Sequence, residues 1–124
     1  MGHKRFVVQE HTTAEGVHWD LMLEHEAALI TFRLAESPEA ALQHAIPAQR
    51  IFDHPAKFLT YEGPVQNGAG RVKIVDSGTF RHGARAKDVW TVSMEGRILK
   101  GDFTLKRTAE DVWRFTATHG QPRR

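Results

Sequence analysis

Arg5-Phe-Val-Val-Gln-Glu-His11, followed closely by Val17-His-Trp-Asp-Leu-Met-Leu-Glu24, is the stretch that most strongly predicts the fold of this chain. In the second segment the apolar side chains of Trp19, Leu21 and Leu23 alternate with mostly polar ones. A period of two is typical of a β-strand with one buried face. The sequence therefore predicts two short strands that are joined by a loop.

Polar residues of these two strands share faces. His18 and Asp20 lie one pleat apart and opposite the apolar row, and Gln9 and His11 are related in the same way. If the two strands pair, His11, His18 and Asp20 converge. Two imidazole nitrogens and one carboxylate are suitable ligands for a divalent metal in a hydrolytic site. A solvated polar face of an amphipathic strand is the alternative interpretation of the same pattern.

The chain has 124 residues and no cysteine. This length suits one domain, which we expect to span residues 1–124 with residues 118–124 frayed. Without cysteine, disulfides, thiolate metal sites and cysteine nucleophiles are excluded. No apolar run approaches the ~20 residues of a membrane-spanning helix, and the N-terminus lacks the apolar region of a signal peptide. We therefore expect a cytoplasmic protein that makes no contact with membranes.

The formal net charge is +2 and the sequence pI is about 9.2, a mild excess that is weak evidence for nucleic-acid binding. Acidic residues dominate from Glu10 to Glu39. Basic residues gather later in the chain, at Arg81, Arg85, Lys87, Arg97, Lys100, Lys106, Arg107, Arg123 and Arg124. This distribution is compatible with a phosphate-binding patch and equally with an ordinary solvated surface.

Strand signals dominate the rest of the chain. β-Branched and aromatic residues with period-two alternation predict strands near Arg5–Gln9, Val17–Leu23, Ala27–Leu34, Phe58–Glu62, Gly70–Asp76, Asp88–Met94, Arg97–Leu105 and Val112–Ala117. Their tryptophans are expected in the core. Between them, Gln66-Asn-Gly-Ala-Gly70 is a strong turn signal, because Asn-Gly favours positive φ.

One short helix is also predicted. Ser37-Pro38-Glu39 offers an N-cap serine, a proline at the first helical position and an acid near the positive end of the helix dipole. Pro47 prevents continuation much past His44. Many short strands and one short helix predict a mainly β fold, in the form of a small closed or partly open β-barrel.

The run from Phe6 to Glu24 resembles the signature of the 3′-phosphoesterase domain of bacterial DNA ligase D. That family reads approximately F-V-V-Q-x-H, then a short loop, then H-[YW]-D-[FL]-x-L-E. Later blocks resemble the family in order and spacing: Asp53-His54-Pro55, Tyr61-Glu62-Gly63-Pro64, the turn ending at Gly70, Val72 to Thr79, and Leu99 to Leu105. The resemblance spans nearly the whole chain, to about Trp113.

The resemblance implies a β-barrel with a manganese-dependent site that trims ribonucleotides and phosphate from the 3′ ends of nucleic acid during repair. By position, the residues matching the family's metal ligands are His11, His18 and Asp20. His54 matches an active-site histidine near the scissile phosphate, and Gln9 and Glu24 match polar residues around it. A His₂Asp site also accepts zinc. Nucleic acid 3′ ends and other repair proteins are the implied partners.

Three departures from the family concern the binding of phosphate. Met22 stands where the family has an arginine able to bind phosphate in a bidentate manner, Glu36 stands where it has a lysine, and Phe58 stands where it often has a tyrosine. The loop between His11 and His18 is also one residue longer. The candidates for supplying positive charge from elsewhere are Arg33, Lys57, Arg71 and Arg81.

The resemblance and the departures from it together predict a free-standing, divergent member of the family. They leave open whether the protein is an enzyme or a binding module. The first hypothesis is a metal-dependent 3′-phosphoesterase, which the retained triad and His54 favour. The main alternative is a non-catalytic module that binds nucleic acid or protein, which the changes at Met22, Glu36 and Phe58 favour. A third hypothesis is hydrolysis of a smaller phosphoester, which needs fewer contacts with phosphate.

Overall fold

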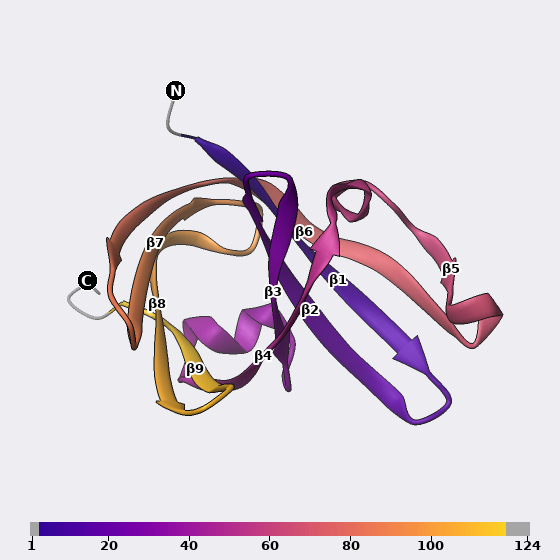
Figure 1. The fold of residues 1–124 in the computed structure, drawn as a ribbon. Helices are drawn as coiled ribbons and strands as arrows, with labels where there is room; N and C mark the ends of the chain where they lie inside the picture. The colour runs from indigo at the N-terminus through magenta and orange to yellow at the C-terminus, as the bar shows by residue number, and fades with distance from the viewer. Residues whose placement is uncertain (1–2, 119–124) are drawn as a thin grey trace.

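Alternation near the N-terminus produces a long hairpin. β1 (Lys4–Thr13) pairs antiparallel with β2 (Gly16–His25), and His11 lies opposite His18 in the register. Both strands extend further than the sequence predicts, so the connecting turn is short. This hairpin and the start of β6 project from the rest of the sheet, as Figure 1 shows.

The computed structural model describes residues 3–118. The remaining strands are β3 (Ala28–Leu34), β4 (Ile46–Pro55), β5 (Gly63–Val65), β6 (Gly70–Arg85), β7 (Val89–Glu95), β8 (Lys100–Ala109) and β9 (Val112–Ala117). All pair antiparallel in the order β1-β2-β3-β4-β9-β8-β7-β6-β5, and a further β1–β6 pairing closes the sheet into a ring (Figure 1). The prediction of a mainly β fold with a closed sheet is confirmed.

The sheet separates two apolar clusters. The main core fills the inner face of the ring and includes Phe6, Val8, Leu21, Phe32, Phe80, Trp90, Phe103, Trp113 and Phe115, all buried. Burying such a side chain stabilises the fold by roughly 1.5–3 kcal/mol. A smaller cluster of Val7, Met22, Leu29 and Leu59 lies on the opposite face of β1, β2 and β3, here called the outer face. The polar partners of the alternation, His11, His18 and Asp20, share this outer face.

β4 (Ile46–Pro55) lies where the sequence predicts no strand. Pro47 and Pro55 argue against a strand in the sequence, because proline cannot donate a hydrogen bond within a sheet. Both prolines lie near the ends of β4, where proline is tolerated. The predicted strand near Phe58–Glu62 is wrong. Its first residues belong to the 3₁₀ helix η2 (Ala56–Leu59), which turns the chain back over the outer face.

The predicted helix exists as the five-residue 3₁₀ helix η1 (Pro38–Leu42). The predicted side-chain cap is wrong: Ser37 makes no capping bond with its side chain, and its backbone carbonyl accepts the N–H of Ala40 at 2.9 Å. The Asn-Gly turn forms η3 (Gln66–Gly68), in which Asn67 has a φ of 57° as the sequence predicts. The described residues therefore contain three short 3₁₀ helices rather than one helix.

A buried carboxylate holds the connection after β7. Asp76 is 3% exposed and accepts hydrogen bonds from the backbone N–H groups of Ser77, Arg97 and Leu99 at 3.0, 2.7 and 2.8 Å. We expect Asp76→Ala to lower the free energy of unfolding by about 2–3 kcal/mol, because buried donors lose their acceptor. Urea unfolding measures this. The control is Asp88→Ala, whose exposed carboxylate lies 3.7 Å from a guanidinium; equal losses would contradict the assignment.

The end of the described chain is attached to the sheet. The backbone N–H of Thr118 donates to the carbonyl of Asp102 at 2.8 Å. The rest of the segment that was expected to fray, residues 119–124, lies outside the described residues. Within residues 3–118, none of the helices has the length and apolar character needed to cross a membrane.

Candidate metal centre

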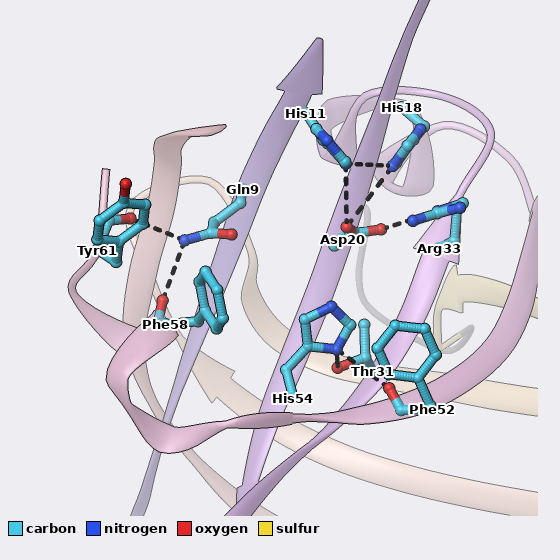
Figure 2. Close-up of polar contacts among 10 residues, drawn as sticks. All are labelled: Gln9, His11, His18, Asp20, Thr31, Arg33, Phe52, His54, Phe58 and Tyr61. Carbon is cyan, nitrogen blue, oxygen red and sulfur yellow. Dashed lines mark hydrogen bonds and ion pairs between the residues drawn. The ribbon is translucent and has the colours of Figure 1, made fainter. Parts of the chain in front are cut away.

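Three side chains converge on the outer face of the β1-β2 hairpin, as Figure 2 shows. His11 Nδ1 lies 2.9 Å from His18 Nε2, and Asp20 Oδ2 lies 3.9 Å from the first nitrogen and 3.6 Å from the second. Ligands held ~2.0–2.2 Å from one cation lie roughly 3–4 Å apart. The three atoms therefore have the spacing of ligands around a single ion.

Burial favours the neutral form of the two imidazoles. The side chains of His11 and Asp20 are only 8% and 3% exposed, and that of His18 is 22% exposed. Desolvation lowers the pKa of both histidines, and the Asp20 carboxylate partly opposes this shift. A neutral imidazole presents a lone pair, which is the form that binds a metal.

The hydrogen bonding of His11 is incomplete. Within the described residues its Nε2 is buried and has no hydrogen-bond partner. The chain comes very close here: a Cβ added to Gly70 would lie 2.8 Å from this nitrogen. Protein atoms thus leave part of the imidazole unsatisfied, although buried polar atoms are usually paired. A cation bound through Nδ1 would leave the proton of the neutral ring on this Nε2, so the unpaired nitrogen does not itself indicate a metal. The donor set of two imidazoles and one carboxylate is what fits a divalent cation.

Arg33 joins the cluster from β3, where it lies opposite Asp20 in the register. Its Nε donates to Asp20 Oδ1 at 3.2 Å, which leaves Oδ2 facing the two histidines (Figure 2). Such a hydrogen bond fixes the orientation of a ligating carboxylate. In the sequence, Arg33 is only one of four basic residues that could supply positive charge. Alternation along β3 places it on the outer face, but only the register places it beside Asp20.

His54 reaches the same cavity from β4. This cavity is lined by Gln9, His11, Asp20, Met22, Arg33, Phe52, His54, Pro55, Phe58, Val65, Gln66 and Val72. His54 Nδ1 lies 3.0 Å from Thr31 Oγ1 and 3.1 Å from the carbonyl of Phe52. The other ring nitrogen points toward the His11, His18 and Asp20 cluster in Figure 2.

Gln9 holds in place the segment from Phe58 to Tyr61, which packs over the outer face and is here called the covering segment. Its side chain is 1% exposed, and Nε2 donates to the carbonyls of Phe58 and Tyr61 at 3.0 and 2.8 Å. These bonds attach η2 and the residues that follow it to β1, which is far away in sequence. Gln9 therefore shapes one wall of the cavity rather than presenting its amide nitrogen to a ligand.

Glu24 lies apart from the other selected residues. It is at the far end of β2, and its carboxylate accepts the backbone N–H of Arg5 at 2.9 Å and lies 3.5 Å from the guanidinium of the same residue. The structure thus brings together His11, His18, Asp20, His54 and Gln9, but places Glu24 outside the residues that line the cavity.

The residues that depart from the family pattern have other partners. Met22 is 1% exposed in the outer apolar cluster. Glu36 lies 3.0 Å from His44 Nε2. Phe58 packs edge-on against His54, with ring centroids 5.8 Å apart. Among the basic side chains named as possible sources of charge, Arg33 is the one that lines this cavity.

The sequence of this chain is similar to those of known proteins. Residues 9–107 match the family model described as the DNA Ligase D 3′-phosphoesterase domain. Over 117 residues the chain is 32% identical to the multifunctional non-homologous end joining protein LigD of Mycobacterium bovis and to the multifunctional non-homologous end joining DNA repair protein LigD of Mycobacterium tuberculosis. Each alignment covers 87% of this chain but only 15% of the relative.

A third relative is the LigD protein of Mycolicibacterium smegmatis, which is 35% identical over 80 residues. That alignment covers 61% of this chain and 10% of the relative. The chain therefore spans a small part of the length of the curated relatives that it matches.

Proposed function

Because the chain belongs to the DNA ligase D 3′-phosphoesterase domain family, we propose that it is a divalent-metal-dependent phosphoesterase that removes a 3′-ribonucleotide or a 3′-phosphate from DNA or RNA ends. The observation that carries the proposal is the convergence of His11, His18 and Asp20 beside a cavity that His54 also lines. These three residues would hold the cation. We propose manganese as the preferred ion and zinc as the alternative, because a His₂Asp set accepts both.

His54 is the proposed proton carrier. The carbonyl of Phe52 can only accept a hydrogen bond, so the Nδ1 that lies 3.1 Å from it carries the proton. Thr31 Oγ1 donates to the carbonyl of Leu29 at 3.1 Å and is thus able to accept from the same Nδ1. In the neutral ring the nitrogen facing the cavity is therefore unprotonated. It takes a proton from the nucleophile or, once protonated, donates to a phosphoryl or leaving oxygen.

The other residues position the reacting groups. When bound, a divalent cation stabilises the negative charge that develops on the phosphoryl oxygens. Arg33 orients the Asp20 carboxylate through Nε and adds positive charge at the cavity. Gln9 keeps the covering segment in place and so limits the access of water. Glu24 supports the start of β1 in this proposal, through its contact with Arg5.

A second candidate function is a module that binds nucleic acid or protein without turnover. The observation in its favour is Met22, which the family pattern makes an arginine and which is buried among apolar side chains here. Loss of a charge-assisted contact costs roughly 1.5–3 kcal/mol of interaction with phosphate. The cavity keeps one guanidinium, that of Arg33, so the enzyme remains the better-supported candidate.

Metal binding is testable without any substrate. We expect saturating Mn²⁺ or Zn²⁺ to raise the melting temperature by several degrees, because a cation at about 100 times its Kd stabilises the folded state by about 2.7 kcal/mol. Thermal unfolding followed by tryptophan fluorescence measures this. Ca²⁺ is the control, since it prefers sites made of oxygen ligands and should produce a smaller shift. Equal melting temperatures with and without Mn²⁺ and Zn²⁺ would contradict the metal site.

Turnover tests the reaction class. A single-stranded DNA oligonucleotide that ends in a 3′-phosphate, and one that ends in a single ribonucleotide, should both be processed in the presence of Mn²⁺ and not in the presence of a chelator. Binding of these oligonucleotides without turnover under any divalent cation would favour the second candidate. The names of the relatives refer to end joining and DNA repair. By extension, we propose that this chain acts in the cytoplasm on nucleic acid ends, together with other repair proteins.

A further inference from the structure

Phe52 is an apolar side chain that the proposed chemistry leaves unexplained. It is 75% exposed, the highest value among the exposed large apolar residues of the described chain. Its ring is nevertheless held in a defined orientation, stacked on the His54 ring with centroids 4.8 Å apart and planes 7° apart. Figure 2 shows Phe52 at the edge of the cluster, next to His54. One aromatic face is therefore packed against a proposed catalytic residue while most of the ring is open to solvent.

Two hollows meet at this ring. The cavity beside the metal cluster and a second hollow, lined by Arg33, Arg50, Ile51, Phe52, Asp53 and Asp111, share only Arg33 and Phe52. If the reacting group of a ligand lies at the metal cluster, the rest of the ligand extends out of the cavity between the Arg33 guanidinium and the Phe52 ring. Arg50 is already paired, since its Nη2 lies 3.7 Å from Asp53 Oδ1.

Arg33 keeps donors available for such a ligand. Its Nε is committed to Asp20 at 3.2 Å, but within residues 3–118 its two Nη groups make no hydrogen bond or ion pair. The side chain is 37% exposed, so these donors are accessible from the hollow. Two free NH₂ groups on a planar guanidinium match the oxygens of a phosphate.

We propose that Phe52 and Arg33 form a subsite for the nucleoside that carries the scissile 3′-phosphate, with its base stacked on Phe52 and its 5′-side phosphate bound by Arg33. The proposal rests on the proposed function and names the substrate class. An exposed aromatic face stacks on a planar base whatever the identity of that base, and the adjacent Arg33 guanidinium binds the phosphate of the backbone. A small phosphoester without a base makes no use of this subsite.

A double-mutant cycle tests the stacking contact. Its probe is a 5′-labelled single-stranded DNA with a 3′-phosphate, prepared with a normal or an abasic terminal nucleotide, and binding is followed by fluorescence anisotropy in EDTA so that turnover is absent. For the unmodified protein we expect loss of the base to weaken binding about tenfold, within the range for one base on an aromatic ring. In Phe52→Leu, which keeps an apolar side chain over His54, the same loss should be less than about twofold. Phe52→Trp should restore the discrimination.

Control variants separate this subsite from general effects. Leu42→Ala changes another exposed apolar residue, which is 45% exposed on η1, and should discriminate like the unmodified protein. Arg33→Gln should weaken binding of both oligonucleotides alike and reduce the slope of log K against log salt by about one phosphate contact. Unchanged discrimination in Phe52→Leu, no discrimination in the unmodified protein, or no binding at all would overturn the subsite.

The subsite and the proposed function fail in different ways. Discrimination that depends on Phe52, in a protein without turnover under any divalent cation, would support the subsite and reject the phosphoesterase. Turnover of both 3′-phosphate oligonucleotides at the same kcat/KM by the unmodified protein and by Phe52→Leu would reject the subsite and support the phosphoesterase.

Discussion

Asp20→Asn is expected to lower Mn²⁺-dependent turnover at least 100-fold and to remove the stabilisation by Mn²⁺. Asp20 Oδ2 lies within 3.9 Å of both histidine nitrogens. Because the other two proposed ligands are imidazoles, Asp20 supplies the only negative charge among the three. Partners that merely orient a ligand typically cost 10–100-fold when they are removed, and a ligand should cost more. Titration with Mn²⁺ by calorimetry and steady-state kinetics on a 3′-phosphate oligonucleotide measure the two effects.

The matched control for this change is Asp53→Asn. Asp53 is 49% exposed and its carboxylate lies 3.7 Å from the guanidinium of Arg50, so it offers an equivalent substitution outside the cluster. We expect the Asp53→Asn variant to bind Mn²⁺ with the same affinity as the unmodified protein. Circular dichroism confirms that both variants are folded. If Asp20→Asn bound Mn²⁺ with unchanged affinity, the cation would have to lie elsewhere, and the metal assignment would be wrong.

The hairpin that carries the ligands was predictable because its pattern is local. Alternation alone places His18 and Asp20 on one face of β2, and a short loop leaves β1 little choice of partner. The family prediction, which depends on the order of several blocks, is confirmed by the match over residues 9–107. The location of His54 follows from that resemblance, since nothing within Asp53-His54-Pro55 distinguishes a site from a turn.

The parts that sequence analysis missed depend on contacts between distant segments. β4 (Ile46–Pro55) was hidden by its prolines, and without β4 the position of His54 against β3 could not be derived. Arg33 is an unremarkable cation in the sequence and acquires its role only through the register with Asp20. The structural role of Gln9 likewise depends on a segment about fifty residues away, whose 3₁₀ turn the strand pattern did not predict.

His54→Ala is the change that separates the enzyme from the binding module. We expect kcat to fall by about 10²–10⁴-fold, the range for a positioned acid or base. The affinity for Mn²⁺ should stay unchanged, because His54 is not among the three proposed ligands. Stability should change by less than about 1 kcal/mol. The buried hydroxyl of Thr31 still donates to the carbonyl of Leu29 at 3.1 Å, so the substitution leaves no unsatisfied donor there.

Two further variants decide how this loss is interpreted. His44→Ala removes a histidine that is 55% exposed and pairs with Glu36 away from the cavity, and its turnover should equal that of the unmodified protein. Thr31→Val keeps the shape but removes the hydroxyl that lies 3.0 Å from His54 Nδ1. Because the carbonyl of Phe52 still accepts from this nitrogen, Thr31→Val should lower kcat less than His54→Ala does. Full turnover in His54→Ala would exclude it as the proton carrier, whereas nucleic-acid binding without turnover in the unmodified protein would assign the chain to the binding class.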